Sequence, residues 1–360
     1  MTSVIKKNKD WLLDYALFMT LKANGKKIVN KAFLSEVDKE VAAQEESFSF
    51  YCFIQYEFYR QWIQLKKHCN DLGIGLIGDL PFYVSEDSSD VWANAHLFML
   101  NQDFQPVGVG GTPPDYFSES GQCWGNPLYD WKQMRVESYD WWIRRIAFHS
   151  QYNDALRIDH FRGFDRYWYI PAEEADARKG HWEKGPGMDL FNAYRKKHGK
   201  AVPIIAEDLG TLDDSFFSFL RKSGFPGMRV MQFAFDAYSD NNHLPHNYIK
   251  NSIAYTGTHD NNTILGWIWE ADESARKQAI EYCNIPSDQW SMGGYQSPAC
   301  RGFLRTLYQS VSSIAIAPIQ DFCGFGADTR VNIPGKPTGN WKVRFTAENF
   351  EKVDKDFLLH

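Results

Sequence analysis

Six short apolar stretches recur along the chain, and each ends in polar or charged residues. Each has the length of a β-strand and is rich in β-branched or aromatic residues, which is typical of strands in a folded core. We therefore predict one strand in each stretch. The stretches span residues 73–84, 154–161, 202–210, 228–236, 252–260 and 312–321.

Helical patterns lie between or before many of these strands. Residues 57–73 place apolar side chains at helical spacing and stop at a glycine, and residues 215–224 and 297–311 look similar. Strands that alternate with helices form parallel sheets, and polar residues at the strand ends favour a barrel with its catalytic groups at that face. The predicted fold class is α/β, a (β/α)8 barrel of the TIM type with helical and loop insertions. A closed barrel has eight strands, and six are predicted here.

Two regions do not fit the strand-and-helix alternation. Residues 1–56 read as helices with a charged loop, and we predict a helical insertion subdomain there. Residues 57–360 then form the catalytic barrel. Within it, residues 85–150 are long and rich in glycine, proline and aromatic residues, which predicts an inserted loop region that covers a cleft.

Charge and cysteine content exclude several classes of protein. The formal net charge is −6 and no basic face is evident, which argues against nucleic acid or an anionic membrane as the main partner. The six cysteines form no CxxC pair, so we expect reduced thiols in a cytoplasmic protein. The N-terminus lacks the apolar stretch of a signal peptide, and no window approaches a membrane span.

Aromatic residues are unusually frequent. They make up 16% of the chain and include 13 tryptophans, many of them beside Gly, Asn, Asp or Pro. This composition fits either a large aromatic core or a cleft that stacks flat ligand faces such as those of sugars. On composition alone, the core is the favoured interpretation.

The stretch DALRIDHF places charged residues inside an apparent strand. Side chains alternate with period two, so Arg157 and Asp159 share one face. An arginine two residues before a carboxylate can hydrogen-bond it and hold it ionised, which would suit a nucleophile. The alternative is a structural ion pair, and for an isolated RxD motif that alternative is favoured.

Two more acids follow predicted strands. Glu207 ends the apolar run VPIIA, where partial desolvation should raise its pKa and suit a general acid. His259 and Asp260 follow the strand before THDNNT. The alternatives are a charge at a helix N-terminus for the first motif and a polar turn with an N-cap for the second.

Acids at three strand ends change the balance between these interpretations. Asp159, Glu207 and Asp260 could converge over one pocket, and a pair of carboxyls is the arrangement of a retaining glycosidase site. Metal binding is the competing use of such clusters, but no HxH or HExxH motif is present, and we predict no metal site. No phosphate-binding glycine motif supports nucleotide chemistry, and we predict no cofactor.

Seven stretches together resemble the 4-α-glucanotransferases of the amylomaltase, or disproportionating enzyme, family (glycoside hydrolase family 77). They occur in the family's order and cover roughly everything from residue 75 onward. The stretches are GDLPFYV, PPDYFSESGQCWGNPLYDW, ALRIDHFRGFDRYWYIPA, GHWEKGPG, IIAEDLG, YTGTHDNNT and QDFCGFG.

The resemblance implies a role for each acid. Asp159 matches the nucleophile that forms the glycosyl-enzyme intermediate, Glu207 the general acid/base, and Asp260 the carboxylate that stabilises the transition state through sugar hydroxyls. Arg157 matches the arginine beside the nucleophile, and His259 a residue that donates to the donor-site glucose.

Further substrate-binding residues are implied in the same way. Asp79, in GDLP, lies at the family's site. The segment PPDYFSESGQCWGNP resembles the loop that folds over the cleft, and in it Tyr116, Phe117 and Trp124 are candidates for aromatic residues that face the sugar.

The chain also departs from the family pattern. Family members carry an N-terminal region, with an SPYQS-type segment, before the part matched here, and that region supplies the first barrel strands. Its absence from this sequence accounts for six predicted strands instead of eight. We therefore expect a missing N-terminal segment or a partner chain.

The implied activity is retaining transfer of α-1,4-glucan segments between maltooligosaccharides, or glucans derived from starch or glycogen, without a cofactor. Two other interpretations stay open. A retaining α-glucan hydrolase would use the same three acids with a wetter acceptor site. A truncated, non-catalytic glucan-binding remnant is the structural alternative.

Overall fold

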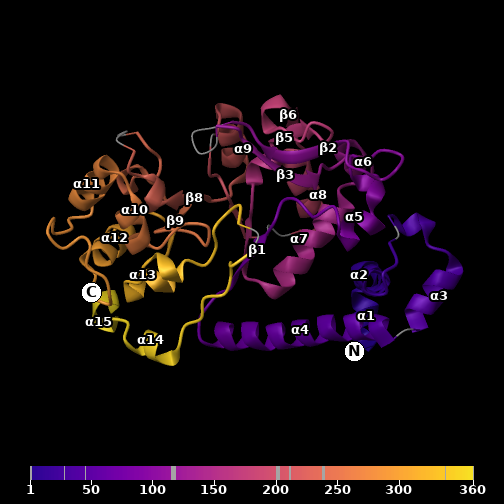
Figure 1. Cartoon of the computed structure of the whole chain (residues 1–360), viewed down its shortest axis with the longest axis horizontal. Coiled ribbons are helices and arrows are strands. Elements are labelled where there is room, and N and C mark those ends of the chain that lie inside the picture. The colour runs from indigo at the N-terminus through magenta and orange to yellow at the C-terminus, as the bar shows by residue number, and fades with distance from the viewer. Residues whose placement is uncertain are drawn as a thin grey trace. The chain divides into compact units, whose positions relative to one another are not determined.

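The described residues of the computed structural model divide into two compact units, Met1–Phe225 (unit 1) and Pro226–His360 (unit 2). Figure 1 labels their helices and strands. The predicted boundary between residues 56 and 57 falls inside one continuous helix, α4 (Glu46–Asp71). The structure describes residues 2–27, 29–44, 46–114, 119–199, 203–210, 212–236, 240–336 and 338–359.

Helices open unit 1, as the sequence predicts, and aromatic contacts join them to the rest of the unit. The indole nitrogen of Trp62 on α4 donates to the carbonyl of Tyr152 at 2.8 Å, and the ring of Trp11 packs edge-on against Phe148 at 5.1 Å. Both partners lie on α7 (Asp140–Tyr152). Before α4 come α1 (Thr2–Lys7), α2 (Lys9–Ala23), the 3-10 helix η1 (Lys31–Phe33) and α3 (Glu36–Gln44).

Three parallel strands form the centre of unit 1. Their order is β1-β4-β7, with β1 at Ile77–Leu80, β4 at Ala155–Ile158 and β7 at Ile204–Ala206. Helix α7 packs against β1 and β4, and the unit continues with α8 (Met188–His198) and α9 (Asp214–Ser223). Each strand leads into a polar loop, so its carboxyl end delivers side chains to one edge of the sheet.

A second sheet of unit 1 was not predicted. It is antiparallel in the order β3-β2-β5-β6, with two strands inside the segment 85–150 that the sequence presented as loop. Glycines permit its close packing, because a Cβ on Gly110 would lie 2.6 Å from the ring of Tyr83. The strands are β2 (Gly108–Thr112), β3 (Gln122–Pro127), β5 (Arg166–Pro171) and β6 (His181–Lys184); the same segment holds α5 (Ser89–Ala93) and α6 (Trp131–Val136).

Unit 2 carries the other three predicted strands. They are parallel in the order β10-β9-β8, with β8 at Gly227–Val230, β9 at Ser252–Tyr255 and β10 at Ile314–Ile316. Its helices are α10 (Ile264–Glu270), α11 (Glu273–Tyr282), α12 (Pro298–Tyr308), α13 (Ile319–Cys323), α14 (Ala347–Glu351) and α15 (Lys355–Leu359). The remaining 3-10 turns of the chain are η2 (Ala95–Leu97), η3 (Phe161–Phe164), η4 (Ala177–Lys179), η5 (Met231–Phe233), η6 (Pro245–Asn247) and η7 (Ala327–Thr329).

The six predicted strands are therefore all present, although each is shorter than the apolar stretch that predicted it. Many of the aromatic residues lie in the core of unit 1, where Phe82, Trp142, Phe161 and Phe164 are buried together. All six cysteines are free thiols. Within the described ranges, no helix is both long and apolar enough to cross a membrane.

Candidate active site

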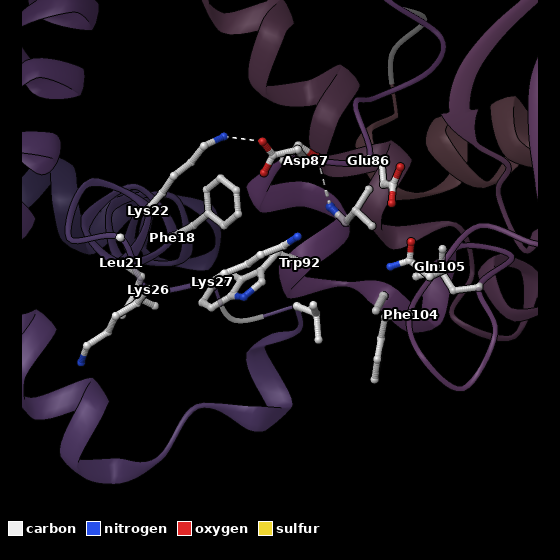
Figure 2. Close-up of a pocket in the computed structure, with 16 residues that line it drawn as sticks. Phe18, Leu21, Lys22, Lys26, Lys27, Glu86, Asp87, Trp92, Phe104 and Gln105 are labelled. Atoms are coloured by element: carbon white, nitrogen blue, oxygen red, sulfur yellow. Dashed lines mark hydrogen bonds and ion pairs between the residues drawn. The ribbon is translucent and has the colours of Figure 1, made fainter.

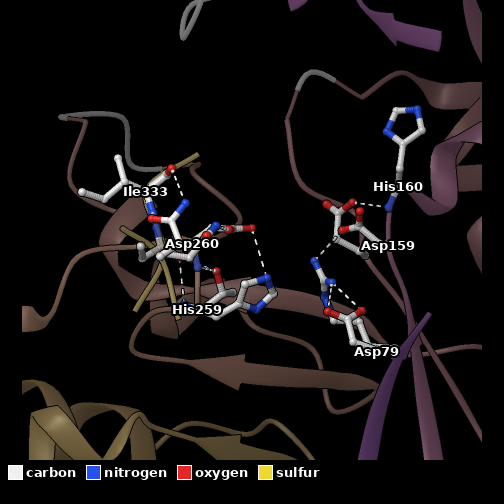
Figure 3. Close-up of polar contacts among 12 residues, drawn as sticks. Asp79, Asp159, His160, His259, Asp260 and Ile333 are labelled. Carbon is white, nitrogen blue, oxygen red and sulfur yellow. Dashed lines mark hydrogen bonds and ion pairs between the residues drawn. The ribbon is translucent and has the colours of Figure 1, made fainter. Parts of the chain in front are cut away.

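Arg157 forms the centre of a charged cluster in unit 1 that includes Asp79 and Asp159, both labelled in Figure 3. The register of β1 and β4 pairs Asp79 with Arg157, and Asp159 follows two residues later on the same face. Nη1 of Arg157 donates to both carboxylate oxygens of Asp79 at 2.7 and 2.8 Å, while Nη2 donates to Oδ1 of Asp159 at 2.8 Å. The arginine thus fixes two carboxylates relative to each other through charge-assisted hydrogen bonds.

Burial and charge act in opposite directions on Arg157. Its side chain is only 11% exposed, which by itself would lower its pKa. The negative charges of Asp159, Asp79 and Glu207 outweigh burial and raise the pKa of Arg157 above its ordinary value. The guanidinium therefore stays charged at neutral pH, as a fixed positive partner for the acids.

Glu207 lies beside Asp159 because of strand pairing. Ile158 of β4 pairs with Ala206 of β7, so the two acids directly follow paired residues of neighbouring strands. Oε2 of Glu207 accepts a hydrogen bond from the backbone N–H of His160 at 2.8 Å, and Oε1 accepts one from the N–H of Leu209 at 2.6 Å. Both carboxyl oxygens are therefore held by the backbone.

The surroundings of Glu207 raise its pKa to about 7. Burial is the largest cause, and the negative charge of Asp159 adds to it, whereas Arg157 and the Leu209 N–H act in the opposite direction. A carboxyl that titrates near neutral pH can both give and accept a proton at that pH. This is the direction that the apolar run before Glu207 led us to expect.

Trp124, one of three predicted sugar-facing aromatic residues, packs beside this cluster. It lies on β3, and its ring meets the imidazole of His160 edge-on at 4.9 Å and the ring of Tyr83 at 6.0 Å. The indole is 38% exposed, so part of its face is open to a ligand. The other two candidates, Tyr116 and Phe117, lie outside the described residues.

In unit 2, His259 and Asp260 lie in the loop between β9 and α10 (Figure 3). Nδ2 of Asn332 donates to Oδ1 of Asp260 at 2.6 Å, and Nη2 of Arg330 donates to the backbone carbonyl of Asp260 at 2.6 Å. Nε2 of His259 lies 3.3 Å from Oδ2 of Asp260, and its ring packs 5.4 Å from that of Trp341. This loop is therefore tied to the segment that follows α13.

Sequence reasoning missed Asn332 and Arg330 as partners of Asp260. They follow Asp260 by about 70 residues, and no strand pattern marks their segment, RVNIPG. The signal that could have found them is the residue types themselves, because the side chains of an Asn and an Arg beside a proline-glycine turn can donate hydrogen bonds to the oxygens of a neighbouring loop.

The buried carboxylate of Asp321 holds the two ends of the same loop. Asp321 on α13 is 1% exposed, and its two oxygens accept hydrogen bonds from the Thr256 hydroxyl at 2.6 Å and the Ile264 N–H at 2.9 Å. Burial raises the pKa of Asp321 to about 6. These two contacts hold both ends of the loop that carries Asp260, at the end of β9 and at the start of α10.

Among the residues that the structure describes, the other polar groups form no metal centre. Across the described ranges, no group of three or more His, Cys, Asp or Glu side chains is arranged to hold a metal ion. His243 accepts a hydrogen bond from the N–H of Val230 at 3.1 Å through Nδ1, and burial lowers its pKa to about 4.

Unit 1 also contains a cavity of about 530 Å³ between helix α2, the turn that follows it and the segment 86–105 (Figure 2). Phe18, Trp92 and Phe104 line it, and Lys22 pairs with Asp87 at its rim. None of the described site residues above is among those that line this cavity.

Comparison with known proteins shows the family to which the chain belongs. A sequence model of the family described as 4-alpha-glucanotransferase matches residues 1–349. The chain belongs to this family. The 4-alpha-glucanotransferase of Clostridium butyricum is 42% identical over 364 residues, which cover 97% of this chain and 73% of the relative. That of Thermus thermophilus is also 42% identical, over 93% of this chain and 68% of the relative.

A solved structure agrees with this assignment to the 4-alpha-glucanotransferase family. The amylomaltase from Streptococcus agalactiae, in complex with acarbose, superimposes with a TM-score of 0.91 at 39% identity, over 99% of this chain and 72% of that one. The family resemblance read from the seven stretches is thus confirmed, as is the α/β fold of the TIM-barrel type.

Proposed function

We propose that the chain transfers α-1,4-glucan segments between maltooligosaccharides by a retaining double displacement, with Asp159 as nucleophile and Glu207 as general acid/base. The observation that carries this proposal is the pairing of the two acids at the ends of β4 and β7, with opposite environments. Asp159 is bound by the Arg157 guanidinium, whereas Glu207 is held in a site that raises its pKa to about 7.

In the first step, an oxygen of Asp159 attacks the anomeric carbon of the donor glucan. The bond from that carbon to the glycosidic oxygen breaks, and Glu207 gives its proton to the leaving oxygen. Arg157 orients Asp159 for this attack, because its Nη2 donates to Oδ1 of that carboxylate at 2.8 Å. Asp79, on the same guanidinium, keeps Arg157 in place.

In the second step, Glu207 accepts the proton of the acceptor glucan's 4-hydroxyl, which attacks the same carbon and releases Asp159. Formation of the covalent intermediate removes the negative charge of Asp159, which is one of the causes of the raised pKa of Glu207. The pKa of Glu207 should therefore fall in the intermediate, and the residue that served as an acid becomes the base.

Transfer exceeds hydrolysis only if a sugar occupies the acceptor site in place of water. Trp124 has a partly exposed indole beside the His160–Glu207 pair, and stacking of a glucose ring on that indole would favour a glucan acceptor. We propose Asp260 as the carboxylate that binds donor hydroxyls and His259 as its neighbouring donor, roles that the family resemblance implies.

Glucans derived from starch or glycogen are the wider substrate class that this activity would serve. The solved structure of the amylomaltase from Streptococcus agalactiae is a complex with acarbose. The six free thiols favour a reducing compartment, in accord with the cytoplasm.

Incubation of the purified chain with maltotriose alone tests this function, with the products separated by size. Glucose together with maltopentaose and longer glucans is the expected result. Glucose with maltose and nothing longer would replace the proposal with the hydrolase alternative. No product from a chain that binds maltotriose would support the non-catalytic alternative.

A further inference from the structure

The N–H that holds Oε2 of Glu207 comes from a residue with an unusual backbone. His160 adopts the left-handed conformation, with φ 47° and ψ 46°, directly after Asp159. The peptide N–H of His160, the residue at which this left-handed turn begins, donates to Oε2 of Glu207 at 2.8 Å. A left-handed conformation costs about 1–2 kcal/mol in a residue with a side chain, so neighbouring contacts must hold it.

Aromatic contacts surround the imidazole and supply that support. The ring stacks on Tyr83 at 6.0 Å with an interplanar angle of 29°, and it meets Trp124 edge-on at 4.9 Å and Phe82 at 5.9 Å. Gly163, three residues on, lets the turn approach Phe82, because a Cβ there would lie 2.6 Å from that ring. The side chain of His160 is thus wedged among three aromatic rings.

The imidazole itself takes no part in this hydrogen bonding. Its buried Nε2 atom has no hydrogen-bond partner, and burial lowers the pKa of His160 to about 4, so the ring is neutral at neutral pH. The charged groups that act on it are Asp159 and Arg162, in opposite directions. A neutral ring without a partner on Nε2 acts here through its shape rather than through proton transfer.

We propose that His160 is a positioning residue for Glu207: its wedged ring locks the left-handed turn whose N–H orients the acid/base carboxyl. Through Trp124, the same ring connects the β2–β3 hairpin to the acid/base. This inference rests on the proposed role of Glu207. It predicts that the rate of transfer depends more on the backbone conformation at residue 160 than on the chemistry of the imidazole.

Two substitutions at residue 160 separate these effects. His160→Val introduces a β-branched residue that resists the left-handed conformation, whereas His160→Asn retains a residue that adopts it readily. We expect the valine variant to lose about 10- to 100-fold in kcat with maltotriose, the effect of losing one hydrogen bond to a charged group. The asparagine variant should lose much less. Ala175→Val, at another left-handed residue (φ 48°), is the control for backbone strain alone.

An activated donor distinguishes a misplaced acid from a damaged fold. Fluoride leaves maltosyl fluoride with little need for a proton, so its release measures the first step without the acid. His160→Val should release fluoride at nearly the parental rate while its reaction with maltotriose is slow. Equal losses with both donors, or no loss with either, would overturn the inference.

A pH profile provides a second readout that a purely structural defect would not move. Asp159, Arg157, Asp208 and the Leu209 N–H act on Glu207 besides burial. Displacement of the N–H of residue 160 weakens a hydrogen bond that favours the ionised carboxyl, so the alkaline limb of kcat/KM should shift to higher pH in His160→Val. An unmoved limb would count against the inference.

The variant Glu207→Gln distinguishes a failure of the acid/base assignment of Glu207 from a failure of the positioning role of His160. It should lose transfer from maltotriose more completely than His160→Val. If Glu207→Gln retained the parental rate, the acid/base assignment itself would be wrong. A parental rate in His160→Val beside an impaired Glu207→Gln would overturn only the role of His160.

Discussion

The two three-stranded parallel sheets position their acids in different ways. In unit 1, Asp79, Asp159 and Glu207 are placed by strand register and held by Arg157 or by backbone N–H groups at the strand ends. In unit 2, Asp260 lies in a loop, and its carboxylate is held by the amide of Asn332, 72 residues later in the chain.

This difference has a chemical consequence. Charge–charge interactions and burial shift the pKa of Glu207 to about 7, as suits a group that exchanges protons. The carboxylate of Asp260 accepts a hydrogen bond from the neutral amide of Asn332, and its side chain is 42% exposed. Such a carboxylate is suited to accept hydrogen bonds from sugar hydroxyl groups. We therefore expect substitutions in unit 1 to affect bond making and breaking, and those around Asp260 to affect sugar binding and transition-state stabilisation.

The largest expected effect is that of Asp159→Asn. Without a nucleophile the double displacement stops, and we expect transfer from maltotriose to fall by about 10,000-fold or more. Glucan binding should remain largely intact, as measured by calorimetry with maltotriose. The matched change Asp260→Asn should cost less, because Asp260 forms no covalent bond. Residual activity near the parental level in Asp159→Asn would refute the nucleophile assignment.

Substitutions of Asn332 sharpen the comparison in unit 2. Asn332→Ala removes the 2.6 Å hydrogen bond to Asp260, and we expect about a tenfold loss in kcat/KM for maltotriose. Asn332→Asp should lose more than the alanine variant, because it sets a second carboxylate against Asp260. Steady-state kinetics on both variants provide the measurement, and the reverse order would contradict the proposed contact.

Trp124→Ala should change the fate of the intermediate more than the rate of its formation. Loss of the aromatic surface removes a stacking contact for the acceptor, and we expect the ratio of hydrolysis to transfer to rise by about threefold to tenfold. Product analysis by size measures this ratio. Trp269→Ala removes another exposed tryptophan, in unit 2, and serves as the control. An unchanged ratio in Trp124→Ala would exclude the acceptor role.

The smallest expected effect concerns stability. The pKa of Glu207 rises from 4.5 to about 7 on folding, so the folded state loses stability as pH rises through that window and bears the full cost above it. Glu207→Gln should raise the free energy of unfolding by about 1–3 kcal/mol near pH 8, with no such gain near pH 4. Urea denaturation at both pH values measures the difference. An equal effect at both would contradict the raised pKa.

The sequence by itself determined the six parallel strands, the residues at their carboxyl ends and the family. Period-two alternation is a local property, so it correctly placed Arg157 on the same face as Asp159. Apolar neighbours likewise indicated the direction of the pKa shift of Glu207. Each of these conclusions depends on residues that are close together along the chain.

Only the tertiary structure decided how the acids are held. The contact of Arg157 with Asp79 depends on the register between β1 and β4, which are more than 70 residues apart in sequence. The antiparallel sheet escaped prediction because β2 is glycine-rich and is stabilised by partner strands, not by its own propensity. The left-handed turn at His160 was equally hidden, because rings from distant segments, Tyr83 and Trp124, hold it in place.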